Sequence, residues 1–164
     1  MVTLIDCKGG SLFPTEPVST YMEFQRDWLR HCKKVADQIK YLSLFESSDS
    51  ILKVFSIEMD ATILSDILKC LHSFMLFDEK MEVNEKKRRN MIVLWLSCFP
   101  KCGRFNLNVA FLDDNEKALL RSIFDWLHQQ LDLSRRQMEK EGLTLNVNDE
   151  DEILETIRQQ YPIS

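Results

Sequence analysis

The sequence predicts an all-α, armadillo-like stack of roughly six to eight helices. Apolar residues recur three and four positions apart along most of the chain, which is the period of a helix packed on one side. Only four Gly and four Pro occur in 164 residues, too few for a turn-rich β sandwich. Hydrophobic residues make up 45% of the chain, enough to fill the core of one domain.

The first helix is expected to begin after a flexible lead-in at residues 1–17, where two glycines and two prolines interrupt any regular pattern. Thr20 and Glu23 have the spacing of a capping box, in which each side chain bonds to the backbone of the other residue. Phe24 and Trp28 follow on one helical face, and aromatic side chains on a capped helix normally pack inward. We therefore expect both to be core anchors rather than partner contacts.

Three further helices follow from the same spacing. Val35, Ile39 and Leu42 predict the second helix, and Ser48–Phe55 the third. Asp60 is a suitable N-cap for the fourth and most regular helix. Its apolar rows are Ile63, Ile67, Leu71 and Met75, with Leu64, Leu68 and Phe74 beside them.

A nearly all-apolar helix is predicted at residues 90–99, after a charged connection at 78–87. A helix that is apolar on all sides belongs in the centre of a fold, and Pro100 should end it. Asp113 and Glu116 form a second capping box, which opens a helix running to Leu131. The apolar side chains of that helix form too broad a set for a surface helix, so we expect cover on two sides.

Residues 104–111 are the ambiguous stretch. Phe105, Leu107, Val109 and Phe111 alternate with smaller or polar residues, which is the period of a strand. A single strand would have no partner in this chain, so a helix is favoured over a strand.

The chain is expected to divide into a helical domain at 18–131, a polar linker at 132–148 and an acidic tail helix at 149–164. The formal net charge of −5 is concentrated toward the end, since residues 132–164 carry eight acidic and four basic side chains. The apolar side of the tail helix suits docking onto its own domain or into a partner groove. Its acidic side suits a solubilising role equally well, and both interpretations stay open.

Composition excludes several functional classes. Five Cys, an odd number set mostly in apolar stretches, indicate reduced thiols and a cytoplasmic protein. No segment reaches the about 18 apolar residues that a membrane helix needs. The basic residues do not form a surface broad enough to bind nucleic acid. No metal-ligand spacing, phosphate loop or catalytic constellation is present, so we expect no cofactor, no metal site and no enzyme.

One basic run offers an alternative of another class. Lys86, Lys87, Arg88 and Arg89 could form a patch that binds microtubules or nucleic acid. Four charges at a helix start are more often a solvated face, so nucleic acid is not an expected partner.

Three motifs together resemble the C-terminal domain family of RNA polymerase II-associated protein 3. They are Tyr-Met-Glu-Phe-Gln-Arg-Asp-Trp-Leu-Arg-His at 21–31, Ile-Leu-Ser-Asp-Ile-Leu-Lys at 63–69 and Gly-Arg-Phe-Asn-Leu-Asn-Val-Ala-Phe-Leu at 103–112. The form of the first motif is closest to the coiled-coil branch of this family, as is the ending on a short acidic helix that closes at Tyr161. The resemblance spans roughly residues 17–131 plus the tail.

The resemblance implies an all-α module that acts through protein contacts. In co-chaperone members this module docks on RuvB-like AAA+ ATPases. In the coiled-coil branch it belongs to a factor that builds and attaches axonemal dynein arms, self-associates and is linked to microtubules. The expected function is thus dynein arm assembly in motile cilia, with co-chaperone docking on RuvB-like ATPases as the alternative and the cytoplasm and axoneme as locations.

Five polar residues are the predicted partner contacts. Arg104, Asn106 and Asn108 form the polar side of the alternating stretch, and arginine is enriched in interfaces. Arg26 and Arg30, in the first motif, complete the set.

Overall fold

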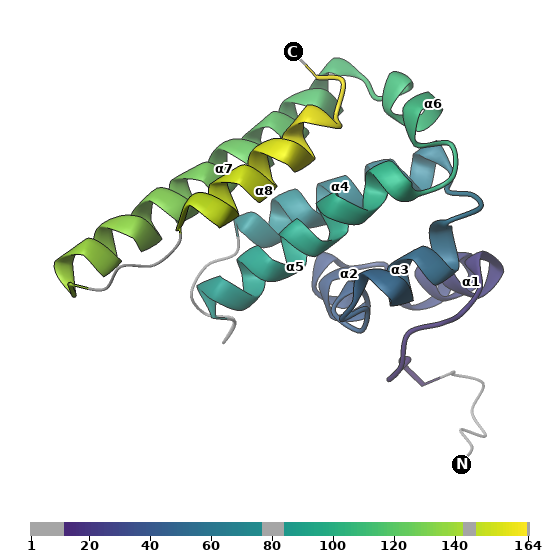
Figure 1. Cartoon of the computed structure of the whole chain (residues 1–164). Coiled ribbons are helices and arrows are strands. Elements are labelled where there is room, and N and C mark those ends of the chain that lie inside the picture. The colour runs from purple at the N-terminus through teal and green to yellow at the C-terminus, as the bar shows by residue number, and fades with distance from the viewer. Residues whose placement is uncertain (1–11, 77–83, 143–146, 164) are drawn as a thin grey trace.

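The computed structural model describes residues 12–76, 84–142 and 147–163, and within these ranges it contains eight α-helices and no β-strand. The helices form three layers, with α4 and α5 in the middle, α1 to α3 on one side and α7 and α8 on the other (Figure 1). The prediction of an all-α stack of six to eight helices is confirmed. The bounds are α1 Tyr21–His31, α2 Val35–Leu42, α3 Ser48–Phe55, α4 Ala61–Met75, α5 Glu85–Cys98, the 3₁₀ turn η1 Phe99–Lys101, α6 Phe105–Ala110, α7 Asp114–Lys140 and α8 Val147–Gln159.

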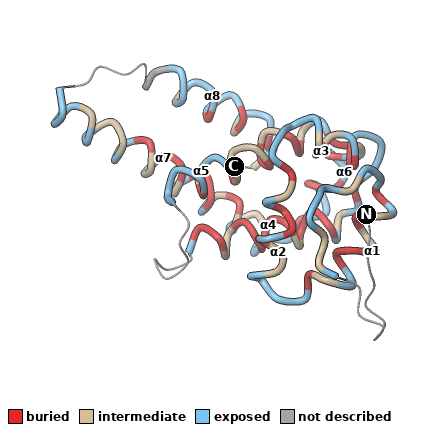
Figure 2. The backbone as a smooth tube through the Cα atoms, turned by 90° about the horizontal axis from the view of Figure 1, so that it is seen from below, coloured by how far each residue is buried: buried red, intermediate tan, exposed pale blue. Residues whose placement is uncertain are grey.

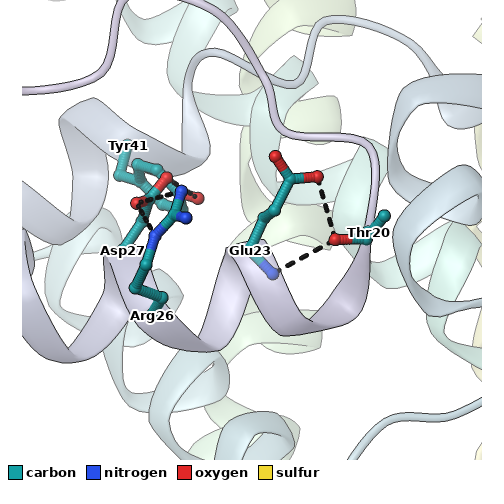
Figure 3. Close-up of polar contacts among 5 residues, drawn as sticks. All are labelled: Thr20, Glu23, Arg26, Asp27 and Tyr41. Carbon is teal, nitrogen blue, oxygen red and sulfur yellow. Dashed lines mark hydrogen bonds and ion pairs between the residues drawn. The ribbon is translucent and has the colours of Figure 1, made fainter.

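Capping residues fix where the helices begin. The Thr20 hydroxyl accepts a hydrogen bond from the Glu23 amide at 3.2 Å and donates to the Glu23 carboxylate at 2.8 Å (Figure 3). Both halves of the second predicted box are present, because Asp113 and Glu116 each accept from the other's amide, at 2.8 and 2.9 Å. Asp60 precedes α4 as expected, but its carboxylate accepts from Gln25 across the layers at 3.0 Å instead of capping the helix.

An aromatic cluster joins the layer formed by α1 to α3 to helix α5 of the middle layer. Phe24 has an exposed fraction of 0% and stacks on Trp28 with ring centroids 5.4 Å apart, which confirms both as core anchors. Phe45 and Phe55 bring the cluster edge-on to Trp95 of α5, at 5.5 and 6.1 Å. Aromatic pairs in this geometry contribute about 0.5–1.5 kcal/mol each beyond the area they bury.

The central helix is covered less completely than its sequence predicts. Ile92, Trp95 and Leu96 of α5 are buried, and the helix gives way to η1 at Phe99 and Pro100. However, Val93 and Leu94 are only half-buried, although they lie in the same apolar stretch. The contacts that α3, α4 and α8 make with α5 leave these two side chains partly exposed.

The end of the chain differs from the predicted division. Residues 132–140 of the expected linker are helical, so α7 continues past its last buried residue, Leu131 (Figure 2). Strong helix formers and an Arg135–Asp132 pair at 3.6 Å support this extension, and Gly142 ends it with a φ of 71°. Residues 143–146 of the linker, 1–11 of the lead-in and 77–83 at the expected charged connection lie outside the described residues.

The tail helix α8 packs on the body rather than standing apart. Leu154, Ile157 and Tyr161 are buried against α5 and α7, and the Tyr161 hydroxyl donates to the Leu96 carbonyl at 2.6 Å. Arg135 of α7 pairs with Asp151 at the other end of the contact. The apolar side of the tail helix therefore docks on the chain's own domain, which is one of the two interpretations that the sequence left open.

Candidate partner-docking surface

The exposed face of α6 combines one cation with two large apolar side chains. Leu107 and Phe111 are four positions apart, so they lie on one side of the short helix, and the exposed Arg104 immediately precedes it. Leu107 is 54% exposed and Phe111 69% exposed. Apolar side chains grouped on a surface around an arginine are typical of protein-binding sites. We call these three residues the α6 surface.

Two contacts fix the α6 surface against the loop after α3. The Gly103 amide donates to the Phe55 carbonyl at 2.9 Å, and a Cβ at Gly103 would lie 1.9 Å from the Ile57 carbonyl oxygen. Only glycine permits so close a backbone approach. The backbone of Ile57, a residue that is 88% exposed, is thereby held beside the start of α6.

Arg104 holds an unusual backbone conformation at the edge of this surface. Its φ of 63° and ψ of 22° lie in the left-handed region, which costs a non-glycine residue about 1–2 kcal/mol. The Arg104 side chain is exposed and makes no capping hydrogen bond to α6. The turn therefore projects an arginine at a strained position, a combination that is common at functional sites.

A polar hollow of about 320 Å³ adjoins Phe111, between the start of α4 and the start of α7. Inside it Glu116 accepts a hydrogen bond from Ser65 and lies 3.8 Å from the Lys69 ammonium. Asp66, on its wall, accepts from the Trp28 indole at 3.3 Å. A partner side chain that passes Phe111 would meet paired charges here, which suits a polar residue.

Asn108 is not available to a partner, so its prediction as a contact is wrong. Its side chain is 4% exposed and donates to the Met59 carbonyl, 49 residues earlier in the chain. The strand-like alternation placed Asn106 and Asn108 on one side, but in a helix these two residues point in different directions. Asn106 is exposed, as expected, and Asn108 anchors α6.

Arg26 and Arg30 lie on α1, in the layer opposite α7 and α8. Both side chains are exposed, but Arg26 also contacts the buried Asp27 carboxylate at 3.4 Å (Figure 3). Asp27 accepts a further hydrogen bond from the Tyr41 hydroxyl at 3.1 Å, and burial together with this carboxylate raises the pKa of Tyr41. Arg26 therefore has an intramolecular role as the counterion of Asp27.

The basic run at the start of α5 does not form a four-residue patch. Lys86 and Lys87 are exposed, whereas Arg88 is 4% exposed, pairs with Glu85 at 3.2 Å and lies over the Phe74 ring at 5.6 Å. Arg89 is half-buried and donates to the Ser134 hydroxyl of α7 at 3.0 Å. Two lysines and part of one arginine remain on the surface.

The described residues contain no cluster of His, Cys, Asp and Glu that could hold a metal ion, and no helix among them could cross a membrane. Cys32, Cys70, Cys98 and Cys102 are buried thiols, and burial raises the pKa of Cys32, Cys70 and Cys102 to about 12. Such thiols are inert at neutral pH.

The apolar members of the α6 surface were not predicted as contacts. Leu107 and Phe111 were assigned to the apolar side of the alternating stretch together with Phe105 and Val109. Phe105 and Val109 are buried, and they are four positions apart. Once a helix is accepted, that spacing leaves the other two apolar residues facing outward.

Comparisons with known proteins agree with this architecture. The sequence model of the family described as the potential Monad-binding region of RPAP3 matches residues 17–117. The dynein axonemal assembly factor 19 homolog of Chlamydomonas reinhardtii is 30% identical over 121 residues, which cover 70% of this chain and 45% of that protein. The chain thus spans less than half the length of this curated relative.

A solved structure shares the fold. The NMR structure of the C-terminal domain of the human RPAP3 protein matches with a TM-score of 0.60 and 19% sequence identity. The match covers 98% of this chain and 96% of that one, so it includes the tail helix. The α6 surface lies within the residues that the family model matches.

Proposed function

The chain belongs to the family described as the potential Monad-binding region of RPAP3, and on that premise we propose that it is a non-catalytic docking module of a factor for assembling or attaching axonemal dynein arms. The observation that carries the docking role is the α6 surface, where Leu107 and Phe111 are exposed beside Arg104. Exposed apolar side chains of this kind contribute little to the stability of a folded domain, and where they are grouped they mark interaction sites.

The dynein assignment is supported by the Chlamydomonas relative, whose name describes a dynein axonemal assembly factor. The first motif supports it as well, since its form resembles that of the coiled-coil branch of the family. The partners we propose are axonemal dynein chains or other assembly factors, met in the cytoplasm and on the axoneme. Self-association and microtubule contact belong to the same proposal as properties of that branch.

A second candidate is docking on RuvB-like AAA+ ATPases, as in the co-chaperone members. The shared fold with the C-terminal domain of human RPAP3 favours it. The two functions are compatible, because one module can present an assembly factor to a chaperone complex.

Affinity capture from a ciliated-cell lysate, followed by mass spectrometry, tests these functions. We expect the tagged chain to recover axonemal dynein chains, and the Arg104→Ala/Phe111→Ala variant to recover them poorly. Recovery of RuvB-like ATPases without dynein chains would contradict the first function and support the second.

The basic-patch alternative has its own test. Binding to microtubules or nucleic acid through Lys86 and Lys87 should fall steeply with salt. The burial of Arg88 reduces the charge available for it. Cosedimentation with microtubules that does not change when both lysines become glutamate would remove this alternative.

A further inference from the structure

The open side of α5 is a second surface that differs from the α6 surface. The sequence of α5 calls for cover on all sides, yet Asn90 is exposed and Val93 and Leu94 are half-buried. A helix that is apolar all round is stable when something covers each side. Within the described residues, no element covers this one.

Two hollows flank the open side and meet along it. One, of about 570 Å³, lies between α2, α4 and α5 and has Phe74 and Met91 in its walls. The other, of about 350 Å³, lies between α5, α7 and α8 and has Leu131 and Ile153 in its walls. Asn90 and Leu94 line both hollows, so the two hollows adjoin along one side of α5. We call this the α5 trough.

The charges around the α5 trough are unevenly placed. Lys87 lines the larger hollow, Arg89 lines the smaller one, and the exposed Lys86 stands beside them at the start of the helix. Each outer wall contributes one carboxylate, Glu46 in the larger hollow and Glu150 in the smaller. Each hollow thus has one cation and one carboxylate in a mostly apolar lining, and the exposed Lys86 adds a positive charge at the start of α5.

We propose that the α5 trough binds an acidic amphipathic helix of a protein partner. Apolar side chains of that helix would enter the two hollows, and its carboxylates would face Lys86, Lys87 and Arg89. The stretch of α5 from Lys87 to Leu94 is about 10 Å long, which matches two turns of a docked helix. Helix-in-groove binding uses apolar anchors three and four positions apart, as two hollows side by side require.

The apolar interior favours a protein over a nucleic acid as the occupant. Nucleic-acid binding depends on many phosphate contacts along a broad basic surface, whereas the trough has three cations at one end. The proposal gives a function to the basic run at the start of α5, which is not part of the α6 surface. It stands independently of the proposed function, and a module with two docking surfaces can bridge two proteins.

Fluorescence anisotropy with the full chain tests the proposal. The probe is a labelled amphipathic peptide of about 15 residues, with leucines on one face and glutamates on the other. A second peptide replaces each glutamate with lysine. We expect saturable binding of the acidic peptide and at least about tenfold weaker binding of the basic one.

Two matched pairs of variants locate the binding site. Lys86→Glu/Lys87→Glu should weaken binding of the acidic peptide about tenfold or more, while Lys33→Glu/Lys34→Glu, the same charge change at two exposed residues between α1 and α2, should not. Ile153→Glu places a charge in the smaller hollow and should weaken binding, while Leu133→Glu alters an equally exposed residue that does not line it.

Several outcomes would overturn the proposal. They are no saturable binding up to about 1 mM, equal binding of the two peptides, equal effects within either pair of variants, and tighter binding of duplex DNA through the same two lysines.

Discussion

Asn106 and Asn108 show how differently two neighbouring residues of one type can act. Asn108→Ala should lower the free energy of unfolding by about 1–3 kcal/mol, because the buried Met59 carbonyl loses its donor. Asn106→Ala, at an exposed position on the same helix, should change it by less than about 0.5 kcal/mol. Urea unfolding measures both. Equal effects of the two substitutions would mean that the Asn108 bond does not anchor α6.

The buried thiols predict how stability depends on pH. The pKa of Cys32, Cys70 and Cys102 is about 12 in the folded chain, against an ordinary value of 9.0. Between these values the unfolded chain loses protons that the folded chain keeps, so stability is complete below pH 9 and falls as the pH rises. The urea midpoint should therefore be lower at pH 10 than at pH 8, and a midpoint that rises would contradict this account.

At this scale the sequence predicts core residues better than surface residues. Phe24 and Trp28 were predicted as core because their spacing and chemistry act locally. Asn108 and Arg88 were mispredicted because their burial depends on Met59 and Phe74, which lie outside the helices that carry them. Spacing along one helix carries no information about such partners.

The helices themselves follow largely from local signals. Capping residues located the starts of α1 and α7, and periodicity gave α2, α3 and α4. The choice of a helix at residues 104–111 is confirmed by α6. The end of α7 was missed because residues 132–140 carry helix propensity without apolar periodicity, and the prediction relied on periodicity.

The tail helix should contribute to the stability of the whole fold. Tyr161→Ala should lower the free energy of unfolding by about 3–5 kcal/mol, since it removes a buried ring and the hydrogen bond to Leu96. Gln159→Ala, an exposed change at the end of α8, is the control and should have little effect. If both variants unfold at the wild-type urea concentration, α8 does not belong to the cooperative unit.

The whole molecule presents two separate surfaces on a three-layer body. The α6 surface lies where the chain turns from the middle layer to α7, and the α5 trough lies along the open side of the middle layer. The all-α architecture could be predicted from composition and spacing. The two surfaces could not, because each is formed by side chains that the packing leaves uncovered.

Binding of the captured partner to variants of the α6 surface tests the central claim most directly. Isothermal titration would compare the wild-type chain with Leu107→Ala/Phe111→Ala and with the control Met22→Ala/Leu29→Ala, which removes two even more exposed apolar side chains from α1. We predict an affinity loss of about thirtyfold for the α6 variant, which corresponds to an interface residue worth about 2 kcal/mol. The control should bind like the wild-type chain, and all three should share one urea midpoint. Full affinity in the α6 variant, or an equal loss in the control, would contradict the assignment of α6 as the docking surface.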